Sequence, residues 1–208
     1  VFAIYRKPLQ LNDLSDPQFA GAVDSDGALE LRTGYGVRQH WIAHVVVAVI
    51  ADGTRAGRTL SGVSMGGYGA LKLAFKNPEF FGSVSAHSPM LIDDFAAAAI
   101  GMRRARMFYA LFDNIFGVSG DLAYWDEHNP LRIARETDRL DDLRIYFDCG
   151  TEDEYGFHVG ATQLSEILKA RGIDHEFHLF PGNHGWDYAS QHTDESLLFH
   201  WNAWKSSQ

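Results

Sequence analysis

Short apolar runs alternate with longer amphipathic stretches along the chain, and this pattern predicts its elements. Apolar runs with the length of buried strands occupy residues 1–5, 59–61, 82–87 and 143–149. Residues 174–180 alternate between polar and apolar, which is typical of a further strand. Helical spacing predicts helices over residues 39–50, 68–76, 159–171 and 194–204. Because strands alternate with helices, we expect an α/β fold with a mostly parallel sheet flanked by helices.

Two segments allow more than one interpretation. Residues 37–51 keep a helical period from Gln39 to Ile50, although the run VVVAVI within them is also typical of a strand. We expect the helix, ended by Asp52-Gly53. Residues 90–130 predict a helical, lid-like insertion that closes with an aromatic loop, LAYWDEHNP. Its phenylalanines fit two roles, lining a pocket or packing the helices on the core: Phe95, Phe108, Phe112 and Phe116.

The chain ends are of different character. Residues 9–36 are rich in Asp, Gly and Ser and predict a long loop. The last predicted helix carries large apolar residues on one face: Leu197, Leu198, Trp201 and Trp204. The length of 208 residues suits one domain, covering 1–208.

Charge and composition narrow the function. The net charge of −9 argues against nucleic acid and anionic membranes as partners. The single cysteine, Cys149, lies in an apolar run and reads as a small buried residue. No apolar run is long enough to span a bilayer, and the start at Val1 shows no signal peptide. We therefore expect a soluble protein, with the cytoplasm slightly favoured.

The segment Arg58–Leu71 holds the first sign of chemistry. Residues 62–66, GVSMG, fit G-x-S-x-G, the nucleophile elbow, in which a strand turns sharply into a helix and exposes a serine, here Ser64. The predicted strand before it and helix after it fit that motif. A glycine-rich turn without catalytic role is the alternative, so the motif needs an acid and a histidine further along the chain.

Both follow in the order Ser…Asp…His, at the carboxyl ends of three predicted strands, where functional groups of parallel sheets gather. His184 lies in a glycine-rich turn after the last strand and is the candidate base. The candidate acids are Asp148, Glu152, Asp153 and Glu154. Loop geometry favours Asp153, because Asp148 falls inside a strand. Histidine spacing matches no usual metal site, so we expect neither a metal nor a cofactor.

Three stretches, SGVSMGGYGALKLAFKNPEFFGSVSAHSP, YFDCGTEDEYGF and FPGNHGWDY, closely resemble the putative esterase (esterase D-like) family of α/β-hydrolases. That family includes feruloyl and acetyl-xylan esterases, S-formylglutathione hydrolases and mycolyltransferases. The resemblance implies Ser64 as nucleophile, Asp153 as acid and His184 as base. The amide of Met65, after the nucleophile, is the expected oxyanion donor. Ser88 and Trp186 are candidates for the substrate pocket.

The resemblance has one departure. The family carries a Leu-His-Gly segment upstream that supplies part of the oxyanion hole, and none precedes Ser64 here. The N-terminus therefore reads as shortened, and the second oxyanion donor is unassigned. A weak or partner-completed enzyme, or a homo-oligomer joined through an exposed sheet edge, fits this reading.

The sequence thus predicts a serine carboxylic-ester hydrolase that acts on small acyl or aryl esters through an acyl-enzyme. The same three residues would serve an acyltransferase, in which an alcohol replaces water. A binding or scaffold domain that lacks a complete oxyanion hole is the alternative outside the enzymes.

Overall fold

A computed structural model describes the backbone of residues 44–49, and both backbone and side chains of residues 54–93 and 122–208. The expected strand at 1–5, the loop at 9–36 and the four phenylalanines of the insertion lie outside these ranges. The described strands form one sheet in the order β1-β2-β3-β4-β5. They are β1 (His44–Val49), β2 (Arg58–Val63), β3 (Ser83–His87), β4 (Arg144–Gly150) and β5 (Glu176–Phe180).

The pairing confirms the expected α/β class with a mostly parallel sheet. Strands β2 to β5 pair in parallel, and β1 pairs antiparallel with β2, with His44 opposite Val63. In the register of the parallel strands, Val63 lies opposite His87 and His87 lies opposite Asp148. The carboxyl ends of β2, β3 and β4 therefore lie side by side at the same end of the sheet.

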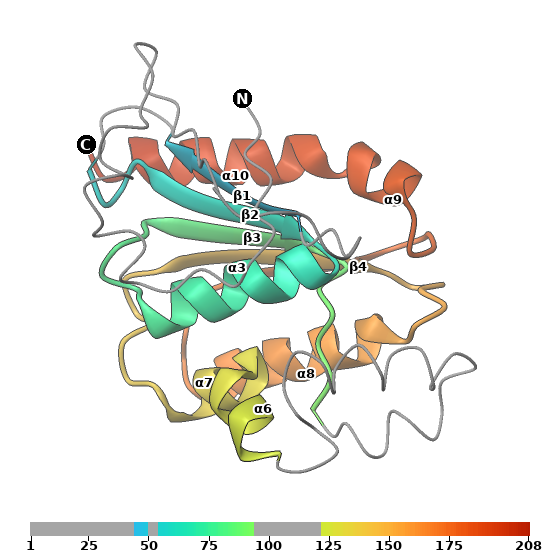
Figure 1. Ribbon diagram of the computed structural model, residues 1–208. Coiled ribbons are helices and arrows are strands. Elements are labelled where there is room, and N and C mark those ends of the chain that lie inside the picture. The colour runs from blue at the N-terminus through green and yellow to red at the C-terminus, as the bar shows by residue number, and fades with distance from the viewer. Residues whose placement is uncertain (1–43, 50–53, 94–121) are drawn as a thin grey trace, which may run out of the picture.

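Helices cover both faces of the sheet (Figure 1). The described helices are α3 (Met65–Lys76), α6 (Ala123–His128), α7 (Pro130–Glu136), α8 (Phe157–Ala170), α9 (Trp186–Gln191) and α10 (Thr193–Lys205). Helix α3 packs on β2 and β3 and helix α8 on β4, while α10 crosses the opposite face over β3 and β4. None of the helices in the described ranges combines the length and apolarity that crossing a bilayer requires.

The expected helix over 39–50 is wrong where the structure describes it. Residues 44–49 form β1 instead. Four of these six residues are valine, whose β-branched side chains favour a strand. Pairing with β2 adds backbone hydrogen bonds between strands, and this pairing favours the strand over the helix that the period predicted.

The aromatic segment before Pro130 is also different from the expected loop. Residues 123–128 form α6, and α7 begins directly after it at Pro130. Asn129 separates the two helices, because its side chain accepts a hydrogen bond from the Leu131 amide and caps α7. The buried Tyr68 hydroxyl donates to the His128 carbonyl at 2.7 Å, which fixes the end of α6 to α3.

The two faces of β3 differ in polarity. Val84 and Ala86 belong to the apolar core, whereas the alternate residues present polar side chains toward α10. His200 of α10 lies with Nδ1 2.7 Å from Ser83 Oγ and Nε2 2.9 Å from Ser85 Oγ. Of the four apolar residues expected on one face of this helix, Trp204 is half-buried, and three are largely exposed: Leu197, Leu198 and Trp201. Helix α10 is therefore attached by the buried polar side chains Ser196 and His200, together with Phe199, whose ring packs against Tyr146 of β4.

The buried imidazole of His200 makes stability depend on pH. Burial, with the neighbouring His87, lowers the pKa of His200 from 6.5 to about 3. Between pH 6.5 and 3, His200 is protonated in the unfolded chain but stays neutral in the native state. The free energy of unfolding therefore falls as the pH drops from 6.5 toward 3. We expect His200→Gln to flatten this slope, measured by urea denaturation at a series of pH values. Equal slopes for the two proteins would contradict the assignment.

Candidate active site

Ser64 stands at the apex of a sharp turn between β2 and α3. Its φ of 56° and ψ of −119° lie in a region that non-glycine residues rarely adopt, so the surrounding structure must hold the strain. The turn closes because Gly62 and Gly66 touch backbone to backbone; a Cβ on Gly62 would overlap the Gly66 carbonyl. The Ser64 amide donates to the His87 carbonyl at 2.9 Å. This is the geometry expected of a nucleophile elbow.

His184 reaches Ser64 from the loop that follows β5. Its Nε2 lies 2.9 Å from Ser64 Oγ. The ring is held edge-on against Tyr155 and Phe157, at centroid distances of 4.9 and 5.2 Å. The His184 amide donates to Glu154 Oε2 at 3.0 Å, and this bond lowers the pKa of that carboxyl. Both the backbone and the ring of His184 are thus fixed by the loop after β4 and the first residue of α8.

Asp153 completes the arrangement from that same loop. Its Oδ2 lies 2.7 Å from His184 Nδ1, and its Oδ1 accepts a hydrogen bond from the Tyr155 amide at 2.9 Å. The Cys149 thiol donates to Oδ2 at 3.5 Å. Burial raises the pKa of Asp153, but these bonds, led by the one from His184, outweigh burial and bring it below its ordinary value. Asp153 is therefore an ionised acceptor for the histidine.

The structure separates the four candidate acids. Only Asp153, of these four, meets the His184 ring. Asp148 is fully buried and lies 2.7 Å from a different histidine, His87. Glu154 binds the His184 backbone, and Glu152 is exposed. The loop argument for Asp153 thus agrees with the geometry.

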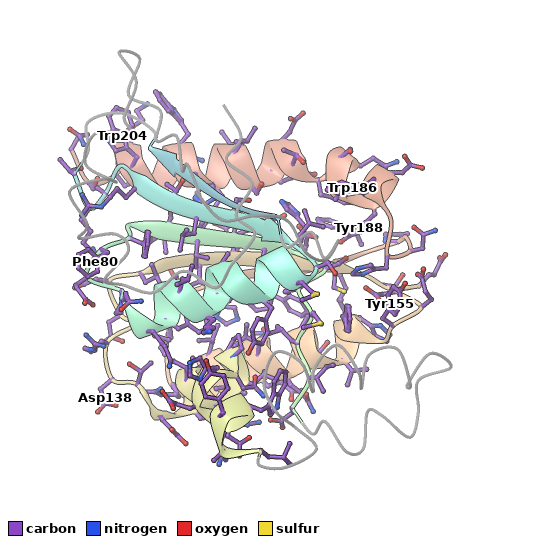
Figure 2. All side chains as sticks on the ribbon, in the orientation of Figure 1. Phe80, Asp138, Tyr155, Trp186, Tyr188 and Trp204 are labelled. Atoms are coloured by element: carbon purple, nitrogen blue, oxygen red, sulfur yellow. The ribbon has the colours of Figure 1, made fainter. Side chains whose placement is uncertain are left out.

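A cavity of about 310 Å³ opens beside Ser64 and His184. Its other described lining residues are Val63, Ser88, Gly185, Trp186 and Ala189. Both expected pocket residues are therefore present. Ser88 is buried and has a positive φ of 41°, which turns the chain sharply as it leaves β3. Trp186 is 63% exposed and lies with Tyr155 and Tyr188 at one end of the sheet, opposite Phe80 and Asp138 (Figure 2).

Other titratable groups at this end of the sheet escaped the sequence reasoning. His87 lies between Asp148 Oδ2 and Ser196 Oγ, at 2.7 and 3.0 Å, and the Tyr188 hydroxyl donates to Asp148 Oδ1 at 2.9 Å. The polar alternation Ser83, Ser85, His87 inside a fully buried strand was the available signal. Within the described ranges, no group of three or more His, Cys, Asp or Glu side chains could hold a metal ion.

The model of the Putative esterase family matches residues 37–197, which contain all three side chains of this arrangement. The chain belongs to the Putative esterase family. A curated acetyl esterase of Caldicellulosiruptor saccharolyticus is 32% identical over 132 residues, covering 62% of this chain and 48% of that protein.

Solved structures show the α/β-hydrolase fold of this family member. An S-formylglutathione hydrolase of Agrobacterium tumefaciens superposes with a TM-score of 0.51 and 25% identity, covering 67% of this chain and 47% of that one. The serine hydrolase FphF of Staphylococcus aureus, described as fluorophosphonate-binding, gives a TM-score of 0.58 at 18% identity, with 72% and 56% covered. The chain thus spans about half the length of these relatives.

The backbone contact under Ser64 gives a test of the elbow. We expect Gly62→Ala to lower the free energy of unfolding by about 3 kcal/mol, because the new methyl meets rigid backbone. Gly156→Ala is the control for an added methyl in open space: Gly156 has a positive φ, of 74°, unlike Gly62, and a Cβ there meets nothing within 4 Å. Its cost should be only the backbone strain, about 1–2 kcal/mol. Equal losses in chemical denaturation would contradict the contact.

Proposed function

We propose that this protein is a serine carboxylic-ester hydrolase with Ser64 as nucleophile, His184 as general base and Asp153 as the acid that orients it. The observation that carries the proposal is the continuous line of hydrogen bonds, 2.9 Å from Ser64 Oγ to His184 Nε2 and 2.7 Å from His184 Nδ1 to Asp153. Membership of the Putative esterase family supports the same chemistry.

The first half of the reaction forms the acyl-enzyme. Asp153 accepts a hydrogen bond from the Nδ1–H of His184, which leaves the Nε2 lone pair facing the Ser64 hydroxyl. As Ser64 Oγ attacks the ester carbonyl, its proton passes to Nε2, and the Asp153 carboxylate stabilises the imidazolium. The imidazolium then protonates the departing alcohol oxygen. The acyl group remains on Ser64 as an ester.

The negative oxygen of the tetrahedral intermediate needs donors. Met65 is the first residue of α3, and the first amides of an α-helix have no acceptor within the helix, so its N–H is the donor we assign. In the second half, water replaces the alcohol, gives its proton to His184 and attacks the acyl carbon. Collapse of that second intermediate releases the acid and restores the Ser64 hydroxyl.

The pocket favours small esters. Its volume of about 310 Å³ is at the lower end of the range for small-molecule sites, roughly 300–1,000 Å³. The indole of Trp186 offers a flat apolar wall at the mouth, which suits an aryl group or a short acyl chain. We therefore propose small acyl or aryl esters as the substrate class.

Removal of the nucleophile tests the function. We expect the wild type to hydrolyse p-nitrophenyl acetate and butyrate near neutral pH, and Ser64→Ala to reduce turnover to background, because no other hydroxyl meets His184 Nε2 in the described part of the chain. Equal, near-background rates for both proteins would overturn the proposal. If an added alcohol captured most of the acyl group, the protein would be an acyltransferase instead.

Neutralising the acid tests the role of Asp153. We expect Asp153→Asn to lower kcat by about 10,000-fold, because the amide no longer stabilises the tautomer and the imidazolium that the reaction needs. The matched control is Glu152→Gln, an exposed neighbour that should keep the wild-type rate. Steady-state kinetics and a thermal melt of each variant check this. A full rate in Asp153→Asn would contradict the assignment.

A further inference from the structure

A second buried polar network joins the ends of β3 and β4 to α9 next to the proposed site, and Asp148 is at its centre. This residue has no exposed surface. Its Oδ1 accepts the Tyr188 hydroxyl at 2.9 Å, and its Oδ2 lies 2.7 Å from His87 Nδ1. Its backbone carbonyl accepts the Ser88 amide at 2.8 Å. One residue of β4 therefore fixes the end of β3 and a residue of α9.

The β3 side of this network reaches the nucleophile. His87 is the last residue of β3, and its carbonyl accepts the Ser64 amide at 2.9 Å. Its Nε2 lies 3.0 Å from Ser196 Oγ, and Ser196 in turn donates to the Thr193 carbonyl at 2.9 Å. His87 thus has two roles: its ring contacts α10 through Ser196, and its backbone carbonyl holds the Ser64 amide.

The α9 side reaches the base. Helix α9 begins at Trp186, directly after the loop that carries His184 and Gly185. Tyr188 also covers the start of that loop, because a Cβ on Gly182 would lie 2.7 Å from the Tyr188 ring. Burial and Asp148 raise the pKa of Tyr188, so its hydroxyl keeps the proton that it donates. Tyr188 therefore contacts the loop before His184 and anchors the helix after it.

We propose that Tyr188, held by Asp148, is a positioning residue that fixes the loop of His184 at hydrogen-bond distance from Ser64. The inference rests on the proposed hydrolase function. The carboxyl of Asp153 and the side chain of Glu154 hold His184 from the β4 side. The Tyr188–Asp148 bond restrains the His184 loop from the α9 side. Asp148 is also bonded to His87, whose carbonyl holds the Ser64 amide, so the base and the nucleophile are positioned by the same strand ends.

Tyr188→Phe removes only the hydroxyl and keeps the ring over Gly182. We expect kcat for p-nitrophenyl acetate to fall by about 10- to 100-fold, since a displacement of roughly 1 Å has that effect on an aligned reaction. KM should stay within a factor of about two. The acid limb of the pH–rate profile should move to lower pH, because a loosened Nδ1–Asp153 bond stabilises the imidazolium less.

Ser83→Ala is the matched control. Like Tyr188→Phe it deletes one buried hydroxyl, but this one joins β3 to α10 at the end of β3 away from the site. We expect a comparable loss in melting temperature with kcat and the pH profile unchanged. The double variant Asp148→Ala/Tyr188→Phe should lose no more kcat than Asp148→Ala alone, because Asp148→Ala already removes the oxygen to which Tyr188 donates.

Labelling of Ser64 by a fluorophosphonate separates this inference from the choice of substrate. Slower labelling of Tyr188→Phe than of Ser83→Ala would support positioning even if no ester tested were hydrolysed. Wild-type kcat and labelling in Tyr188→Phe, or equal losses in Tyr188→Phe and Ser83→Ala, would overturn the inference. A wild type that neither hydrolyses nor labels would overturn the hydrolase function together with it.

Discussion

The whole arrangement depends on a backbone held in an unfavourable conformation at Ser64. A non-glycine residue with a φ of 56° costs free energy, of order 1–3 kcal/mol, and is kept only when its neighbours leave no alternative. Here the constraint comes from the direct backbone contact of Gly62 with Gly66 and from the His87 carbonyl that accepts the Ser64 amide. The strain exposes the serine hydroxyl to a histidine from another loop.

The two faces of the sheet differ in the side chains that they bury. The face of the sheet under α3 is apolar and belongs to the hydrophobic core, with Leu60, Val84 and Phe147 among its fully buried side chains. The face under α10 carries polar side chains that hydrogen-bond across to the helix, with Ser83 and Ser85 meeting His200 and His87 meeting Ser196. Burying polar groups is costly unless each finds its partner, so this face contributes a defined geometry more than net stability.

Much of the site could be predicted from the sequence because its chemistry is local. The elbow motif names Ser64, the position after the last strand names His184, and the loop after an earlier strand favours Asp153 over three neighbouring acids. What failed depended on pairing partners elsewhere in the chain. The helix expected over β1 is wrong because the period within residues 39–50 carries no information about pairing with β2, whose residues follow 9 to 19 positions later. The network of Asp148 joins residues 61 and 109 positions apart, as in His87–Asp148 and His87–Ser196, and no spacing rule connects them.

The polar contacts of α10 have a further consequence for how this helix finds its place. His200 and Ser196 are one helical turn apart, about 6 Å, which matches two residues along a strand, also about 6–7 Å. His200 therefore meets Ser83 and Ser85 while Ser196 meets His87. A purely apolar helix could slide along the sheet at little cost. Here a shift by one turn would leave several buried donors and acceptors unmatched at once, so the helix has a single register on the sheet.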